Sequence, residues 1–205
     1  YSSLCEYRLK MRLAYFVSHP IQYHAPLLRL LSADPEIDLK VFFYSDFSLR
    51  SYADEGFGTS IQWDVPLVEG YNYHFLDCKG SKRYYNHFRQ PVAKDIQHQL
   101  QVGQFDAVWV HGWSWLCSLQ AIIAAKRLGL PVLLRGESNG LTDPANQLKK
   151  RIKLAFLNWL FERVDCFLYV GSLNQRFYRE HGISEEKLFS FPYAVDNLFF
   201  RNGVE

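Results

Sequence analysis

Short apolar runs rich in β-branched and aromatic residues alternate along the chain with longer segments whose apolar positions recur at helical spacing. The short runs predict strands over residues 12–17, 38–44, 72–76, 106–110, 131–134, 166–170 and 187–191. The longer segments predict helices over residues 25–33, 90–101, 113–128, 146–164 and 172–181. This alternation predicts an α/β fold, a doubly wound parallel sheet of about six to seven strands with helices on both faces.

Proline and glycine positions set the expected helix ends. Pro26 and Pro91 stand where a first helical turn tolerates a missing N–H, so they are expected to open the helices over 25–33 and 90–101. Ser172 is expected to cap the last helix and Gly182 to end it. Residues 45–70 are polar with little periodicity and predict a long connection.

Composition restricts the class of protein. The 205 residues, 48% of them hydrophobic, are enough for one large domain, and a net charge of +2 argues against nucleic acid as a partner. Four scattered cysteines without a C-x-x-C pair suit a reducing compartment, and no apolar run reaches the roughly 18 residues of a membrane span. We therefore expect a cytoplasmic protein. Residues 1–10 precede the single methionine, Met11, and are interpreted as an N-terminal extension or a cloning remnant.

The helix over 146–164 allows two interpretations. Its first turns carry Lys149, Lys150, Arg151 and Lys153, which would let it lie on an anionic membrane, peripherally at the inner membrane face. The favoured interpretation is a helix that packs on the sheet through Ile152, Phe156, Trp159 and Leu160, with its lysines in water.

Polar side chains follow four of the predicted strands, at the edge where an open parallel sheet binds ligands. Imidazoles, amides, indoles, an arginine and a carboxylate suit polyhydroxyl ligands, because hydroxyls need both donors and acceptors and sugar rings stack on aromatic faces. The candidate binding residues are Ser18, His19, Gln22, Tyr23, His24, Gly112, Trp113, Arg135, Glu137, Ser138, Ser172 and Asn174. His111 is the candidate catalytic residue, as general base on an acceptor hydroxyl or as an orienting group.

Several other chemistries lack their sequence signatures. The histidines and cysteines form no metal-ligand spacing, so no metal site is predicted. The sequence contains no G-x-S-x-G elbow of a serine hydrolase, and the first loop contains no G-x-G-x-x-G for a dinucleotide.

Ordered motifs along residues 11 to about 200 resemble family 4 glycosyltransferases of the GT-B fold. The opening M-R-L-A-Y-F-V-S-H-P-I-Q-Y-H, then V-W-V-H-G-W and L-P-V-L-L-R-G-E-S, carry the resemblance. The stretch F-P-Y-A-V-D-N-L-F-F is similar to the family's passage from its first domain into its second. Residues 18–23 differ from the many relatives that have glycines in this loop, which favours recognition of the acceptor by side chains over backbone contact with phosphate.

The resemblance implies the acceptor-binding, N-terminal half of a retaining, nucleotide-sugar-dependent glycosyltransferase of glycan or glycolipid biosynthesis. Residues 11–191 would be one Rossmann-like domain, and residues 192–205 would start the linker to a missing C-terminal domain that binds the nucleoside-diphosphate sugar. The acceptor would be a sugar or a lipid-linked sugar, and no cofactor is expected in this chain. Two alternatives stay open, half of a GT-B sugar-nucleotide epimerase and a non-catalytic carbohydrate- or nucleotide-binding domain.

Overall fold

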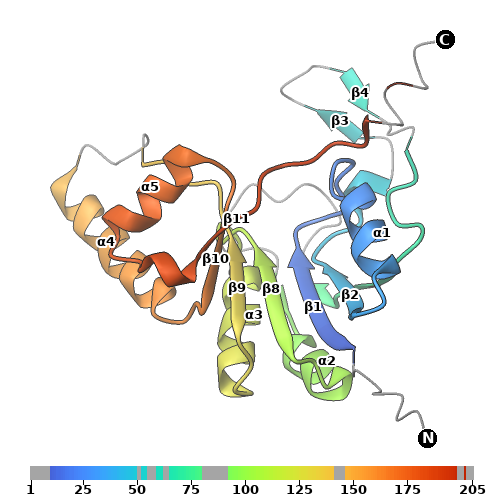
Figure 1. Cartoon of the computed structure of the whole chain (residues 1–205), viewed down its shortest axis with the longest axis horizontal. Coiled ribbons are helices and arrows are strands. Elements are labelled where there is room, and N and C mark those ends of the chain that lie inside the picture. Colours follow the sequence, from blue (N-terminus) through green and yellow to red (C-terminus); the bar gives the residue numbers. More distant parts are fainter. Residues whose placement is uncertain are drawn as a thin grey trace, which may run out of the picture.

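The computed structural model describes residues 10–49, 52–54, 59–61, 65–79, 92–140, 146–197 and 201, and is built on a seven-stranded parallel sheet. The strands lie in the order β11-β10-β9-β8-β1-β2-β5, with β1 in the interior (Figure 1). Their bounds are β1 Met11–Val17, β2 Ile37–Phe43, β5 Asn72–Phe75, β8 Ala107–His111, β9 Val132–Arg135, β10 Cys166–Tyr169 and β11 Leu188–Ser190. The predicted α/β class and strand number are confirmed.

In the part of the chain that the structure describes, five α-helices connect or cover these strands: α1 Ala25–Ala33, α2 Ile96–Gly103, α3 Leu116–Arg127, α4 Gln147–Phe161 and α5 Ser172–Glu180. Two small antiparallel pairs stand apart from the main sheet, β3 Tyr52–Asp54 with β4 Thr59–Ile61 and β6 Cys78–Lys79 with β7 Val92–Ala93. Part of the expected 45–70 connection is thus a hairpin. Two short 3₁₀ turns, η1 Phe47–Leu49 and η2 Glu185–Lys187, complete the elements.

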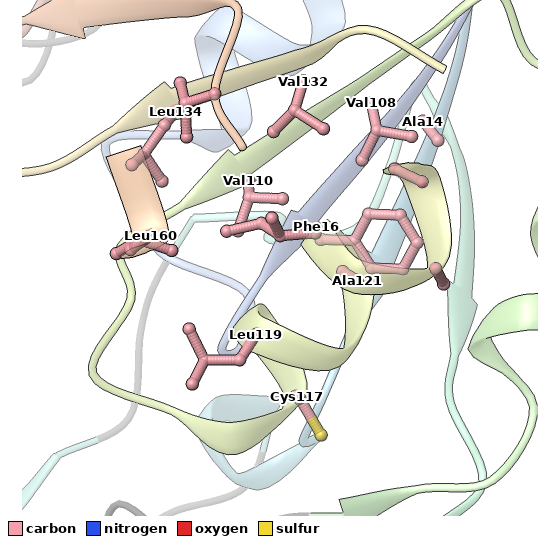
Figure 2. Close-up of a cluster of buried hydrophobic side chains, with 14 of the residues drawn as sticks. Ala14, Phe16, Val108, Val110, Cys117, Leu119, Ala121, Val132, Leu134 and Leu160 are labelled. Carbon is pink, nitrogen blue, oxygen red and sulfur yellow. The ribbon is translucent and has the colours of Figure 1, made fainter. Parts of the chain in front are cut away.

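Alternating side chains on the strands build two separate cores, one on each face of the sheet. On one face, Phe16, Val108 and Leu134 join a cluster with residues of α3 and α4 (Figure 2). Residues of α2 and α5 also belong to this cluster. On the other, Tyr15 and Trp109 pack in a smaller cluster with Ala25 and Leu28 of α1. This period of two along continuous apolar strands is what a sheet buried on both faces requires.

The predicted helix over 90–101 is wrong at its start. Val92–Ala93 is a strand, and the helix begins only at Ile96. Gln120 of α3 explains the extended backbone, since its side chain bonds both the N–H of Ala93 at 3.1 Å and the carbonyl of Ala93 at 3.0 Å. Pro91 lies outside the described residues.

The predicted cap of α5 is also wrong. Gly171 occupies the N-cap position, and no side chain caps the helix; Ser172 is already its first residue. Asn174 takes a bracing role instead, accepting from the N–H of Val170 at 3.1 Å and donating to the Ser138 carbonyl at 2.7 Å. It therefore ties the loop after β9 to the end of β10.

Helix α4 packs on the sheet as favoured, but by a different set of residues. Leu157, Leu160 and Phe161 are buried, and Phe156 and Trp159 pack partly against the same cluster. Ile152, expected in the core, is 61% exposed. Ile152 lies about 140° from Leu157 around the helix, and it stands in the first half of α4, before the buried positions begin. No helix among the described residues is long and apolar enough to cross a membrane.

Candidate functional site

The segment that follows β11 crosses the carboxyl edge of the sheet and runs towards α1, where the red trace passes above the strands in Figure 1. Between this segment, the loop after β1 and the start of α1 lies a cavity of about 740 Å³. It is lined by Gln22, Tyr23, Pro26, Arg29, Val65, Pro66, Glu137, Tyr193, Ala194, Val195 and Asp196. The cavity thus lies at the strand edge where ligands of open parallel sheets bind.

A chain of hydrogen-bonding groups leads from the buried sheet to this cavity. The hydroxyl of Tyr15 lies 3.2 Å from Nδ1 of His24 and 3.1 Å from Nδ1 of His111. On its other side, Nε2 of His111 lies 3.6 Å from Oε1 of Glu137, whose side chain is 55% exposed. Of these four side chains, Glu137 is therefore the one that a ligand in the cavity would contact.

The positions of these groups favour one proton arrangement. Glu137 is a carboxylate and only accepts, so Nε2 of His111 carries the proton that faces it. Nδ1 of neutral His111 then accepts from the Tyr15 hydroxyl, which leaves the Tyr15 oxygen to accept from Nδ1–H of His24. This order holds the imidazole of His111 in one tautomer, aimed at Glu137.

Burial keeps the three imidazoles neutral. It lowers the pKa of His24 to about 2 and that of His19 to about 4, and in both rings the nearby His111 adds to the effect. Burial also lowers the pKa of His111, against the opposing influence of its contact with Glu137. The same contact with His111 lowers the pKa of Glu137, so this carboxyl is charged at neutral pH.

Arg135 ends β9 beside this chain and is only 1% exposed. The ring of Tyr193 lies over its guanidinium at 4.1 Å and the ring of Phe191 at 4.9 Å. Tyr193 also contacts Tyr23 edge-on, with ring centroids 5.2 Å apart. Aromatic rings from the loop after β1 and from the crossing segment therefore share one wall of the cavity.

Of the other predicted site residues, Gln22 and Tyr23 line the cavity. Ser18 bonds the ring of His19, which packs on Phe47. Gly112 takes a left-handed φ of 74° and donates its N–H to the Arg135 carbonyl, joining the ends of β8 and β9.

The remaining predicted residues do not line the cavity. Trp113 packs against Phe161 with centroids 5.8 Å apart, and Asn174 is buried at 3% in its bracing role. Ser138 supplies that brace with its carbonyl, and Ser172 is exposed at the start of α5. Asn174 and Ser138 thus join the loop after β9 to the end of β10, and a direct role of these four residues in binding stays a prediction.

Sequence reasoning missed Tyr15, Tyr193 and Gly136. Tyr15 lies within a continuous apolar strand, where nothing distinguishes a core ring from one whose hydroxyl orders two histidines. Tyr193 lies in the segment interpreted as a linker, although an aromatic residue after Pro192 was a usable signal. Among the described residues, no group of three histidine, cysteine or acidic side chains is arranged to hold a metal ion.

A family model and several solved structures match the chain. The sequence model described as "Glycosyl transferase 4-like domain" matches residues 62–194. No curated relative matches the chain by sequence.

Solved structures agree with the fold. A UDP-N-acetylglucosamine 2-epimerase is 14% identical with a TM-score of 0.50, over 89% of this chain and 48% of its own length. Anabaena HepE in complex with UDP and glucose is 12% identical with a TM-score of 0.54, over 91% of this chain and 45% of its own. The chain thus spans less than half the length of these structures, and identities this low show a shared fold alone.

Proposed function

Since the chain belongs to the family of glycosyl transferase 4-like domains, we propose that its cavity binds the acceptor sugar of a nucleotide-sugar-dependent glycosyltransferase. The observation that carries this proposal is Glu137, a charged carboxylate at the cavity wall that His111 contacts from behind. An oriented carboxylate accepts from a sugar hydroxyl, and the rings of Tyr23 and Tyr193 give a sugar ring apolar faces.

In this proposal His111 and Glu137 act as a unit. Glu137 accepts the hydrogen bond of the reacting hydroxyl and takes its proton, and the Nε2–H of His111 holds the carboxylate in place. The contact distance of 3.6 Å is loose, which suits a pair that tightens when a ligand binds. His111, expected as the catalytic base, is in this proposal a positioning residue that acts through Glu137.

The donor, a nucleoside-diphosphate sugar, would be held by a second domain beyond residues 192–205, and transfer would retain the anomeric configuration. The relatives' greater length supports a two-domain enzyme. Incubation of this chain with UDP-glucose and candidate acceptors should therefore give no transfer, and turnover by the chain alone would reject the division into halves. Consumption of UDP-N-acetylglucosamine without an acceptor, once the second domain is supplied, would favour the epimerase alternative.

Replacement of Glu137 by glutamine is expected to weaken acceptor binding by roughly 10-fold, the effect of losing one charge-assisted hydrogen bond. Saturation-transfer NMR with glucose, galactose, mannose and N-acetylglucosamine measures this. Glu69→Gln is the matched control, because Glu69 is exposed and does not line the cavity. Equal binding by the two variants would remove Glu137 from the acceptor site. The histidine signals offer a second readout, since Glu137→Gln should lower the pKa of His111 further by removing the group that raises it.

Helix α4 supports the peripheral membrane contact as a second part of the proposal. Its outward face exposes Leu148 at 67% and Ile152 at 61%, next to Lys149 and Arg151, and the helix Gln147–Phe161 contains no acidic residue. Apolar side chains flanked by cations suit an anionic lipid surface, to which each nearby cation contributes about 1 kcal/mol. Such a contact would bring the cavity to a lipid-linked acceptor.

Vesicle co-sedimentation tests this contact. The chain should bind vesicles of phosphatidylcholine with phosphatidylglycerol and not vesicles of phosphatidylcholine alone, and Leu148→Ser with Ile152→Ser should lower binding at least about 5-fold. Leu30→Ser is the control, because Leu30 is 72% exposed on α1, away from this cluster of cations. Equal binding to both kinds of vesicle would contradict the assignment to α4. A loss of binding in Leu30→Ser as large as that in the Leu148→Ser and Ile152→Ser variant would contradict it as well.

A further inference from the structure

Arg135 is a buried cation whose hydrogen-bonding capacity is only partly used. Its Nε and Nη2 atoms are inaccessible to solvent and have no hydrogen-bond partner among the described residues. Among these residues no carboxylate lies in ion-pair contact with Arg135, and Glu137, two residues along the chain, is in contact with His111 instead. A buried guanidinium normally has these N–H groups satisfied, so their state indicates a partner that the described residues do not supply.

The geometry of Nε and Nη2 limits the chemical class of that partner. Nε–H and one N–H of Nη2 point in parallel along the same side of the planar guanidinium. This side-on pair is the one that matches the two oxygens of a carboxylate or of a phosphate. A neutral hydroxyl would satisfy only one of the two and would not compensate the buried charge.

Tyr193 lies between the guanidinium of Arg135 and the cavity, because its ring contacts the first and lines the second. Its ring covers the guanidinium at 4.1 Å, yet Tyr193 is 41% exposed and lines the cavity on its other side. Phe191, the second ring over Arg135, is fixed by its N–H to the Tyr169 carbonyl at 2.8 Å and by Trp109. Of the two covering rings, Tyr193 is therefore the one that can turn away without disturbing the sheet.

We propose that Arg135 is a gated oxyanion site, at which a carboxylate or phosphate of the sugar substrate binds side-on to Nε and Nη2 once the Tyr193 ring swings off the guanidinium. Without ligand, the cation–π contact with Tyr193 stands in for the anion and keeps the charge from being unpaired. The inference rests on the proposed function for the identity of the ligand as a sugar, and it narrows the substrate to an anionic one. The anion belongs either to the acceptor or to the diphosphate of the donor.

Calorimetric titration of the chain with glucose, glucuronate, UDP and inorganic phosphate tests the site. Glucuronate should bind at least about 5-fold more tightly than glucose, as expected for one charge-assisted bidentate contact. Tyr193→Ala should raise the affinity for glucuronate and phosphate about 3-fold or more by opening the site, whereas Tyr193→Phe, which keeps the ring, should behave as wild type. Arg135→Lys keeps the charge but loses the side-on pair, and should abolish the preference for glucuronate.

Arg29→Gln is the matched control, because Arg29 is the arginine that lines the cavity and its guanidinium bonds the Pro66 carbonyl at 3.0 Å. A glucuronate preference that Arg29→Gln removes and Arg135→Lys leaves intact would overturn the inference. Comparison of Tyr193→Ala with Tyr193→Phe tests the gate even where Arg135→Lys fails to fold. Identical phosphate binding by the two variants would reject the gate.

The four ligands also distinguish a failure of the anion site at Arg135 from a failure of the proposed acceptor site. Equal binding of glucose and glucuronate leaves the acceptor site standing and rejects the anion site. Phosphate binding that depends on Arg135, with no binding of either sugar, rejects the acceptor site and supports the anion site. Tighter Arg135-dependent binding of UDP than of glucuronate assigns the anion to the donor, and the reverse assigns it to the acceptor.

Discussion

Acidification from pH 7 to pH 5 is expected to lower the free energy of unfolding by about 2 kcal/mol through His24 alone and by about 4 kcal/mol through His24 and His19 together. The folded state holds His24 neutral down to pH about 2 and His19 down to pH about 4. The unfolded chain takes up both protons below pH about 6.5. The contribution of the two neutral histidines to the free energy of unfolding, present above pH 6.5, is therefore lost as the pH falls. For each histidine the loss ends only below its folded-state pKa.

Urea unfolding at pH 7, 6 and 5 measures this loss. His24→Asn, whose amide can still donate to the Tyr15 hydroxyl, should be less stable at pH 7 but should lose about half of the pH dependence. His98→Asn, at an exposed position of α2, is the control and should keep the wild-type slope. An unchanged slope in His24→Asn would show that the buried imidazole is not the source of the acid sensitivity.

Replacement of Gly136 by alanine is expected to cost about 1–3 kcal/mol of stability and to abolish acceptor binding. A Cβ at this position would lie 2.0 Å from a ring carbon of Trp113, and that ring is packed against Phe161. The clash is relieved only by moving the Trp113 ring or the backbone that places Arg135 and Glu137 on either side. Chemical denaturation and saturation-transfer NMR measure the two effects.

Gly171→Ala is the matched control, because Gly171 follows the neighbouring strand β10, has an extended backbone and has nothing within 4 Å of the added Cβ. Gly136→Ala combined with Trp113→Leu should recover part of the lost binding, since the smaller side chain makes room for the Cβ. A Gly136→Ala variant as stable as Gly171→Ala, with normal binding, would contradict this steric account.

The sequence was sufficient for the sheet and for the edge at which the site lies. Continuous apolar strands and intervening helical periods predict parallel order, and parallel order brings the residues after β1, β8 and β9 together. His111, Glu137, Gln22 and Tyr23 were found in this way, because each follows a strand that the pattern identifies.

Contacts between elements could not be predicted in the same way. Whether Trp113 faces a ligand or the core depends on Gly136, which leaves room for the indole ring but is 23 residues away in sequence. The extended backbone at Ala93 depends on Gln120, and the role of Tyr193 depends on the path of a segment without regular structure. Local propensity carries none of this information, so the misplaced start of the helix over 90–101 and the omission of Tyr193 share one physical cause.

The interior position of β1 also bears on how the chain acquires its structure. β1 is the first strand of the described residues, yet one of its two neighbours, β8, lies some 90 residues later, and the Tyr15–His111 contact joins residues 96 apart. Until β8 arrives, β1 has one edge open and part of its apolar surface uncovered. Pairing over such a distance is entropically costly, which predicts a slow final step in refolding. The hydrogen-bonded chain from His24 to Glu137 would then form late, so recovery of ligand binding should lag behind recovery of helical circular dichroism.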